Sequence, residues 1–230
     1  MSKKELAAID NFIKLLLKVT FRICHWDEDG NLKSRSSGFL YQKDSNSPIL
    51  VITAGHETPP NGSFIETSFV QDEHMASLSA GEFKVFYSEG GIDYAYSILP
   101  LDLIRNSLSE GMSFEFTIYK EPFVKANTED VYGFAVKNNY EFVRNGDNYI
   151  VPTYLCSELY MTLVKQDEHT NYFETSRAIQ DHEYYRGASG SPIADTSGLI
   201  CSILVGGTDP IQYLKGFRLD NIELPHDERN

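Results

Sequence analysis

The sequence predicts an all-β protein with one amphipathic helix at its N-terminus. Apolar residues recur at three- and four-residue steps, the helical period, only in the first part of the chain. Beyond it, short runs rich in Val, Ile, Phe, Tyr and Thr are separated by Gly, Asn, Asp and Pro, with no helical pattern between them. Many short strands at such spacing favour antiparallel sandwiches or barrels over a parallel α/β sheet.

The helix is expected over residues 3 to about 17. Ser2 followed by Glu5 has the capping-box spacing that begins a helix. The apolar stripe of this helix comprises Leu6, Ile9, Phe12, Ile13, Leu16 and Leu17. Because most such stripes face the core of their own protein, we expect the helix to pack on the strands, and docking to a partner is the alternative.

The strand-like runs divide into two halves at a polar, glycine-containing stretch, residues 103–111. We therefore predict two units, residues 1–108 with the helix and the first strands, and residues 109–230 with the remaining strands. The predicted strands cover residues 21–26, 38–42, 49–53, 63–69, 82–87, 94–99, 113–119, 132–136, 149–151, 159–164, 199–205 and 213–217.

Charge and composition restrict the partners. The 33 acidic against 20 basic residues give a net charge of −13, which repels phosphate backbones, so nucleic acid is not an expected partner. A protein or peptide partner fits better. No segment is long enough to span a membrane, and the N-terminus lacks the unbroken apolar stretch of a signal peptide. Cys24, Cys156 and Cys201 are too few and too widely spaced for a disulfide framework, which predicts a cytoplasmic protein with buried thiols.

One serine stands among small residues in the segment from Tyr185 to Ile193. A tight turn there can expose the hydroxyl of Ser189 and aim backbone N–H groups at one point. Gly187 has no Cβ, so its N–H can turn toward a developing oxyanion, with the N–H of Ser189 as the second donor. An ordinary surface turn is the alternative interpretation.

A histidine and an aspartate occupy positions that suit such a serine. His56 follows the apolar run 49–53, and an imidazole with a pKa near 7 on a stiff strand is the base that a serine nucleophile needs. Asp93 begins the apolar run 94–99, where a partly buried carboxylate needs a partner such as an imidazole N–H. The alternatives are a strand-end histidine with an ordinary hydrogen bond and a turn aspartate.

These blocks resemble the three motif blocks of the chymotrypsin-like (trypsin-like) serine peptidases. The blocks are Thr53-Ala54-Gly55-His56, Asp93-Tyr94-Ala95 and Gly187-Ala188-Ser189-Gly190-Ser191-Pro192, in the order His, Asp, Ser, and the resemblance covers about residues 18–220. It implies two packed antiparallel Greek-key β-barrels, with His56 and Asp93 in the first and Ser189 in the second. It also implies cleavage of peptide bonds through an acyl-enzyme, without a cofactor.

The resemblance assigns roles residue by residue. Ser189 would be the nucleophile, His56 the general base, Asp93 the group that orients the imidazole, and the N–H groups of Gly187 and Ser189 the oxyanion hole. The residues Leu204, Val205, Gly206 and Gly207 would pair with the substrate backbone. Glu183, six residues before the nucleophile, would form the floor of the specificity pocket and favour a basic residue before the cleaved bond. Glu57 stands where secreted animal members have a cysteine, which agrees with a bacterial, cytoplasmic relative.

Three other functions compete with this one. The protein could be a catalytically silent binding module, or one gated by an activating protein partner that docks on the N-terminal helix. A metal-dependent hydrolase is disfavoured, because His25, His74, His169, His182 and the His56-Glu57 pair lack the spacing of metal ligands, so no metal site is expected. A thiol protease is disfavoured, because Cys201 lies within an apolar strand.

Overall fold

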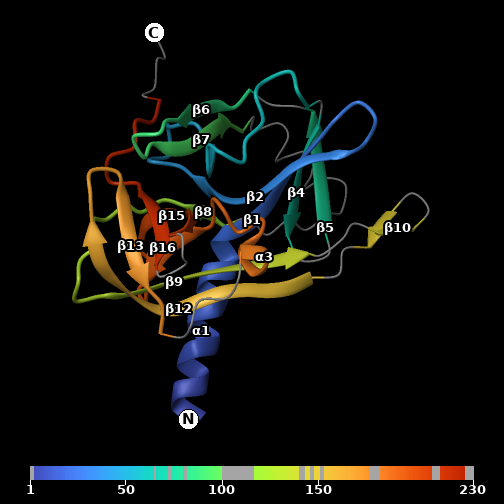
Figure 1. Cartoon of the computed structure of the whole chain (residues 1–230). Helices are drawn as coiled ribbons and strands as arrows, with labels where there is room; N and C mark the ends of the chain where they lie inside the picture. The colour runs from blue at the N-terminus through green and yellow to red at the C-terminus, as the bar shows by residue number, and fades with distance from the viewer. Residues whose placement is uncertain are drawn as a thin grey trace.

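Two groups of strands build most of the molecule, and one long helix, α1 (Lys3–Val19), runs along them (Figure 1). The computed structural model describes residues 3–64, 66–71, 74–79, 82–99, 117–139, 143–145, 148–150, 153–176, 182–208 and 213–225. The prediction of an all-β fold with an N-terminal helix is confirmed. Within these ranges, no helix is long and apolar enough to cross a membrane.

The first group is a single sheet of eight strands. They are β1 (Thr20–Trp26), β2 (Leu32–Tyr41), β3 (Leu50–Thr53), β4 (Glu66–Gln71), β5 (His74–Ser79), β6 (Lys84–Tyr87), β7 (Asp93–Ile98) and β8 (Ile118–Tyr119). Seven of them pair antiparallel in the order β5-β4-β1-β2-β3-β7-β6, and β8 adds to β2 in parallel. Successive side chains of β3 point to opposite faces of the sheet. Val51 packs in an apolar cluster formed by the first group alone, and Ile52 packs in the core that this group shares with the second.

The second group closes into a barrel of six strands. They are β9 (Val131–Asn139), β12 (Thr153–Gln166), β13 (Thr170–Glu174), β14 (Pro192–Asp195), β15 (Ile200–Gly207) and β16 (Leu214–Arg218), joined in the order β12-β13-β16-β15-β14-β9. The short helix α3 (His182–Tyr185) precedes the Ser189 turn. Strands β10 (Val143–Asn145) and β11 (Asn148–Ile150) form a separate hairpin. The barrel interior is apolar, with Phe134, Phe173 and Ile193 fully buried.

A shared apolar core fixes the two groups against each other. Phe39 and Ile52 of the sheet lie in one cluster with Ala135 and Phe217 of the barrel. The ring of Tyr94 stacks on Phe217, with ring centroids 5.1 Å apart. Close packing of this kind resists sliding, because shifted side chains would leave voids. The relative position of the two groups is therefore well defined, and the candidate site depends on it.

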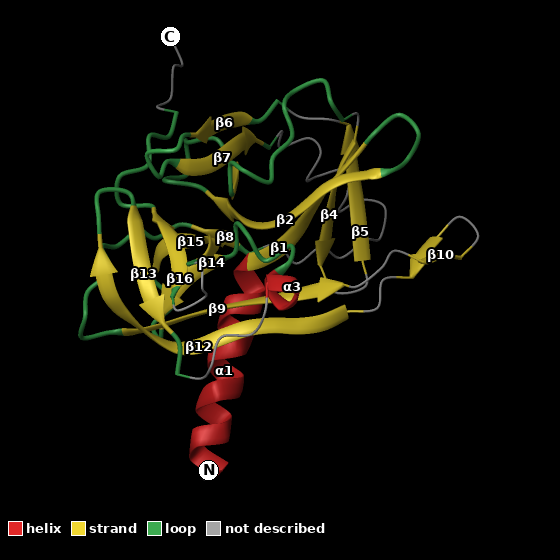
Figure 2. Ribbon diagram, in the orientation of Figure 1, coloured by secondary structure: helices red, strands yellow, loops and turns green. Residues whose placement is uncertain are grey.

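Helix α1 packs mainly on the barrel, although the chain leads from it into the first sheet. Phe12 and Leu16 are buried in the shared core, and Gly133 of β9 makes room for Phe12, because a Cβ there would lie 2.9 Å from its ring. The Thr20 hydroxyl donates to the Leu16 carbonyl at 2.9 Å and ties the helix end to β1. Leu6 was predicted to belong to the covered apolar stripe, but it is 51% exposed. It lies near the N-terminal end of α1, which extends beyond the strands (Figure 2).

The predicted boundary between residues 108 and 109 lies outside the described residues, and so does the predicted N-cap Ser2. On its N-terminal side, β7 ends at Ile98 in the first sheet, and on its C-terminal side β8 returns to that sheet before the barrel begins with β9.

Candidate active site

The structure brings His56, Asp93 and Ser189 together from both groups of strands. His56 Nδ1 lies 2.7 Å from Asp93 Oδ2, and His56 Nε2 lies 3.2 Å from Ser189 Oγ. The backbone N–H of His56 also donates to Asp93 Oδ1 at 3.0 Å, so both carboxylate oxygens hold the histidine. The first sheet supplies the acid and the imidazole, and the barrel supplies the hydroxyl.

Local backbone contacts explain why His56 is held so firmly. The chain leaves β3 at Thr53 and turns at Gly55, whose Cβ, if present, would lie 2.8 Å from the Phe86 carbonyl. Thr58 closes the turn after His56: its N–H donates to Gly55 at 3.1 Å and its hydroxyl to Ala54 at 2.9 Å. The turn therefore packs closely against the neighbouring strands, which fixes the backbone position of His56.

The charges around His56 favour its protonated form. Burial lowers the pKa of His56, but the hydrogen bond and charge of Asp93, followed by the charge of Glu57, outweigh it and hold that pKa above 6.5. Glu57 Oε1 lies 3.6 Å from His56 Nε2, the nitrogen that faces Ser189. A stabilised imidazolium suits a base that must accept a proton from a hydroxyl.

Two glycines shape the turn that carries Ser189. The Ala188 N–H donates to the Tyr185 carbonyl at 2.8 Å, and the Ser191 N–H donates to the Ala188 carbonyl at 2.9 Å, which closes two consecutive turns. Gly187 and Gly190 occupy the third position of each, with φ of 83° and 88°, conformations that side chains disfavour. The N–H groups of Gly187 and Ser189 make no hydrogen bond to any group of the described residues, so both can serve an anion.

The first sheet anchors this turn from across the interface. The Ser37 hydroxyl of β2 donates to the Gly187 carbonyl at 2.7 Å, and the Ser37 N–H donates to the Ser189 carbonyl at 2.6 Å. Ser37 is fully buried. These contacts fix the Gly187–Ala188 and Ser189–Gly190 peptide groups, which lie on either side of the peptide that carries the Ser189 N–H, so the backbone around that N–H cannot rotate freely.

A pocket of about 230 Å³ opens beside Ser189. The predicted oxyanion residue Gly187 and the predicted substrate strand Leu204, Val205, Gly206 and Gly207 line it together with His56 and Ser189. Four further lining residues were not predicted: Glu57, Tyr185, Arg186 and Leu214. Glu183 lies in α3, but its side chain is outside the described residues.

Strand β15 offers an open edge at this pocket. The ladder with the neighbouring segment ends at Leu204, whose N–H donates to the Ser191 carbonyl at 2.8 Å and whose carbonyl accepts from Gly190 at 2.7 Å. From Val205 to Gly207, the strand pairs only with β16 among the described residues. An extended peptide could therefore add to the free edge in the manner of a new strand.

The competing sites do not assemble in the described part of the chain. No group of three or more metal-ligating side chains occurs there. His25 is buried against Phe64 and Phe83, and burial lowers its pKa to about 4. Cys201 is fully buried in β15, where burial raises the pKa of its thiol to about 12, so it is a poor nucleophile.

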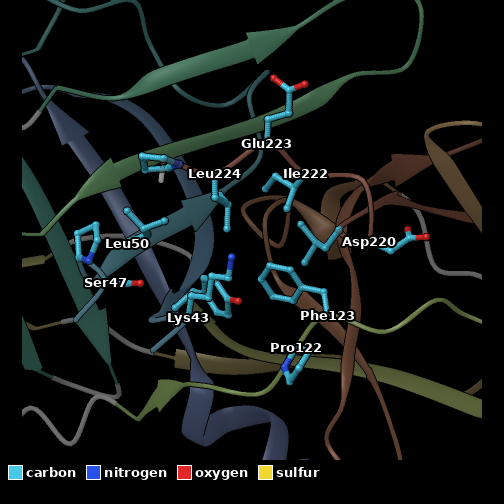
Figure 3. Close-up of a pocket in the computed structure, with 13 residues that line it drawn as sticks. Lys43, Ser47, Leu50, Pro122, Phe123, Asp220, Ile222, Glu223 and Leu224 are labelled. Carbon is cyan, nitrogen blue, oxygen red and sulfur yellow. The ribbon is translucent and has the colours of Figure 1, made fainter. Parts of the chain in front are cut away.

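A second pocket, of about 520 Å³, is separate from this site (Figure 3). Leu50 of the first sheet, Phe123 and the C-terminal residues Ile222 and Leu224 line it. It shares no described lining residue with the pocket at Ser189, and none of the predicted site residues described in the structure lies in it.

Neither a protein-family model nor a curated protein sequence matches the chain. Solved structures do match it. A catalytically inactive tobacco etch virus protease complexed with substrate aligns with a TM-score of 0.55 and 13% identity, over 90% of this chain and 80% of that one. The active form of the Mycobacterium tuberculosis protease Rv3671c aligns with a TM-score of 0.50 and 11% identity, over 93% and 81%.

A third similar structure is the serine endoprotease of Yersinia pestis, with a TM-score of 0.53 and 10% identity, over 91% of this chain and 61% of that one. All three share the chymotrypsin-like arrangement of two packed β-structures. At these identities the likeness establishes the fold, and this chain has the chymotrypsin-like fold.

Proposed function

We propose that the protein is a serine endopeptidase with Ser189 as nucleophile, His56 as general base and Asp93 as the orienting acid. The observation that carries the proposal is the position of His56, which lies 2.7 Å from Asp93 Oδ2 and 3.2 Å from Ser189 Oγ at the same time. Both distances are within hydrogen-bond reach, as nucleophilic catalysis by a serine requires.

In the proposed reaction, Ser189 Oγ attacks the carbonyl carbon of the peptide bond, and its proton passes to His56 Nε2. The negative charge that develops on the carbonyl oxygen is stabilised by the N–H groups of Gly187 and Ser189. His56 then gives the proton to the leaving amine nitrogen, the C–N bond breaks, and an ester to Ser189 remains. Water, deprotonated by His56, hydrolyses this ester and restores Ser189.

The substrate is proposed to be a protein or peptide that lies extended along residues 204–207. The open edge of β15 supports this, because backbone hydrogen bonds to that edge would bring a carbonyl to Ser189. The net charge of −13 argues against a nucleic acid, and three free buried thiols are consistent with the cytoplasmic location that we propose.

The proposal is tested by labelling the purified protein with a fluorophosphonate probe and reading the intact mass. We expect one adduct on the wild type and none on Ser189→Ala or His56→Ala. Ser191→Ala is the matched control, since this neighbouring serine is buried and should leave labelling intact. A wild type that does not label would contradict constitutive activity and would support the binding module or the partner-gated form instead.

A further inference from the structure

We propose that the pocket between the first sheet and the C-terminal residues binds a small amphipathic carboxylate, with Lys43 as the partner of its head group and apolar walls around its chain. The inference goes beyond the proposed function, because this pocket shares no described lining residue with the pocket at Ser189 and binding there needs no catalytic step.

The size and the place of this pocket suit a small ligand. Its volume of about 520 Å³ lies within the range of about 300–1,000 Å³ that is usual for ligand sites, which often lie between two structural units. Leu50 of the first sheet lines one wall, and Leu224, in the segment that follows the last barrel strand, lines another. A bound ligand would therefore contact both groups of strands.

The apolar walls are held in place without a ligand. Tyr41 of β2 stacks on Phe123 with ring centroids 4.5 Å apart, and Tyr41, Leu50 and Leu219 are all buried. The Leu219 N–H donates to the Cys201 carbonyl of β15 at 3.1 Å, which attaches the C-terminal wall to the barrel. Since little of the wall has to become ordered on binding, most of the apolar contact energy remains available for affinity.

Lys43 supplies a positive charge to this pocket. Figure 3 shows its side-chain nitrogen directed toward the space between Leu224 and Phe123. Its backbone is fixed nearby, because the N–H of Gln42 donates to the Tyr119 carbonyl at 3.0 Å. Among the described residues, no hydrogen bond or ion pair engages the ammonium group. It is exposed to solvent, so it can meet a charged head group without burying an unpaired charge.

The acidic residues around the pocket do not cancel this charge. Asp220 accepts hydrogen bonds from Arg218 at 3.0 and 2.6 Å, and its carboxylate points away from Lys43, as does that of Glu223 (Figure 3). Asp44 accepts hydrogen bonds from its own turn. The net charge of −13 is distributed over the chain, and salt screens it beyond about 8 Å, whereas a head group on Lys43 would be in contact with the ammonium.

One ammonium group beside apolar walls matches a ligand with one negative charge on an apolar body. A carboxylate carries a single charge at neutral pH and accepts a charge-assisted hydrogen bond from lysine. A phosphate monoester would bring up to two charges for one partner. The walls include Leu50, Leu219, Ile222 and Leu224, so an alkyl chain is the body that we test.

The experiment compares decanoate, decanol and decyltrimethylammonium, which share a chain length and differ in head-group charge. Thermal unfolding of the full chain is followed below the micelle-forming concentration of each compound, and calorimetric titration gives the Kd. We expect decanoate to raise the thermal midpoint by about 3–6 °C at ten times its Kd. No shift with decanoate, or an equal or larger shift with either of the other compounds, would overturn the proposal.

Two charge-removing variants place the binding site. Lys43→Met should weaken decanoate binding by about 10-fold or more, because it removes the partner of the carboxylate. Arg186→Met is the matched control, since it removes a cation from the pocket at Ser189, and decanoate should bind to it as to the wild type. Unchanged affinity in Lys43→Met, or a loss confined to Arg186→Met, would refute the assignment to this pocket.

The same measurements separate this inference from the proposed function. Neither the thermal midpoint nor the Kd depends on catalysis, so decanoate should bind equally to the wild type and to Ser189→Ala. A wild type that fails to label with the fluorophosphonate but binds decanoate through Lys43 would support this inference and contradict constitutive activity. A labelled wild type that does not bind decanoate would refute the inference alone.

Discussion

Replacing Ser37 with alanine tests whether the first sheet holds the Ser189 turn of the barrel in place. The change removes the hydroxyl that donates to the Gly187 carbonyl at 2.7 Å and leaves that carbonyl buried without this donor. An unmet buried acceptor costs about 1–3 kcal/mol. If the Gly187–Ala188 peptide rotates to recover this energy, the backbone from Gly187 to Ser189 shifts and the two proposed oxyanion donors leave their positions, so kcat should fall by roughly 5- to 150-fold.

The assay measures kcat and KM on one peptide substrate, together with the thermal midpoint. Ser36→Ala is the matched control, because Ser36 is equally buried and accepts a hydrogen bond from Thr53 at 3.0 Å. Both variants should lower the midpoint by a few degrees, while only Ser37→Ala should lower kcat with KM nearly unchanged. Equal kcat values in the two variants would show that the turn holds itself and that the contact across the interface has no catalytic role.

Three other changes address the remaining parts of the site. Asp93→Asn removes the acceptor for His56 Nδ1–H and should slow fluorophosphonate labelling by about 10⁴-fold; retention of a tenth of the rate would contradict the assigned role. Glu57→Gln removes one of the charges that raise the pKa of His56. Because the neutral imidazole is the base in the proposed reaction, the rise of kcat/KM with pH should then begin at lower pH, and an unmoved profile would exclude a contribution of Glu57. Gly190→Ala would place a Cβ 2.6 Å from Thr53 Oγ1 at a φ of 88°, so chemical denaturation should show a loss of about 2 kcal/mol or more. Gly30→Ala, with a φ of 75° and nothing within 4 Å, is its control and should cost about 1 kcal/mol.

The blocks that form the site could be found in the sequence because each is continuous. An apolar run ending in His56, an acid at the head of another run, and small residues around Ser189 are local patterns with a physical meaning. The contacts that connect the blocks leave no local pattern. The bond from Ser37 to Gly187 joins residues 150 positions apart, and nothing near either residue indicates it.

Several strands were missed or shortened for identifiable reasons. Strand β14 begins at Pro192, a residue typical of turns that is tolerated as the first residue of a strand. Strand β12 runs over Thr153–Gln166, whereas the prediction covered residues 159–164. Ser157 and Glu158 interrupt its apolar pattern, yet both are buried. Glu158 is a single acidic residue among apolar ones, and this pattern could have indicated a buried carboxylate.

The first half of β2 was also missed, because apolar and polar residues alternate only weakly from Leu32 to Arg35 and none of these residues is fully buried. Strand β13 (Thr170–Glu174) mixes polar and aromatic residues without alternation, and it was not predicted at all. In both cases the partner strands, rather than the intrinsic preference of the segment, decide the extended conformation. Helix α1, whose periodicity is strong, was predicted over nearly its whole length.

The order in which the barrel closes affects the protein while it is still being synthesised. Strand β16 sits between β13 and β15, so the ring is incomplete until residue 218 has left the ribosome. Helix α1 emerges first, but β9, on which it packs, begins only at Val131. At about 5–20 residues per second the apolar stripe waits on the order of 10 s for its cover. During that time His56 and Ser189 are not yet held together, and the uncovered apolar stripe favours aggregation.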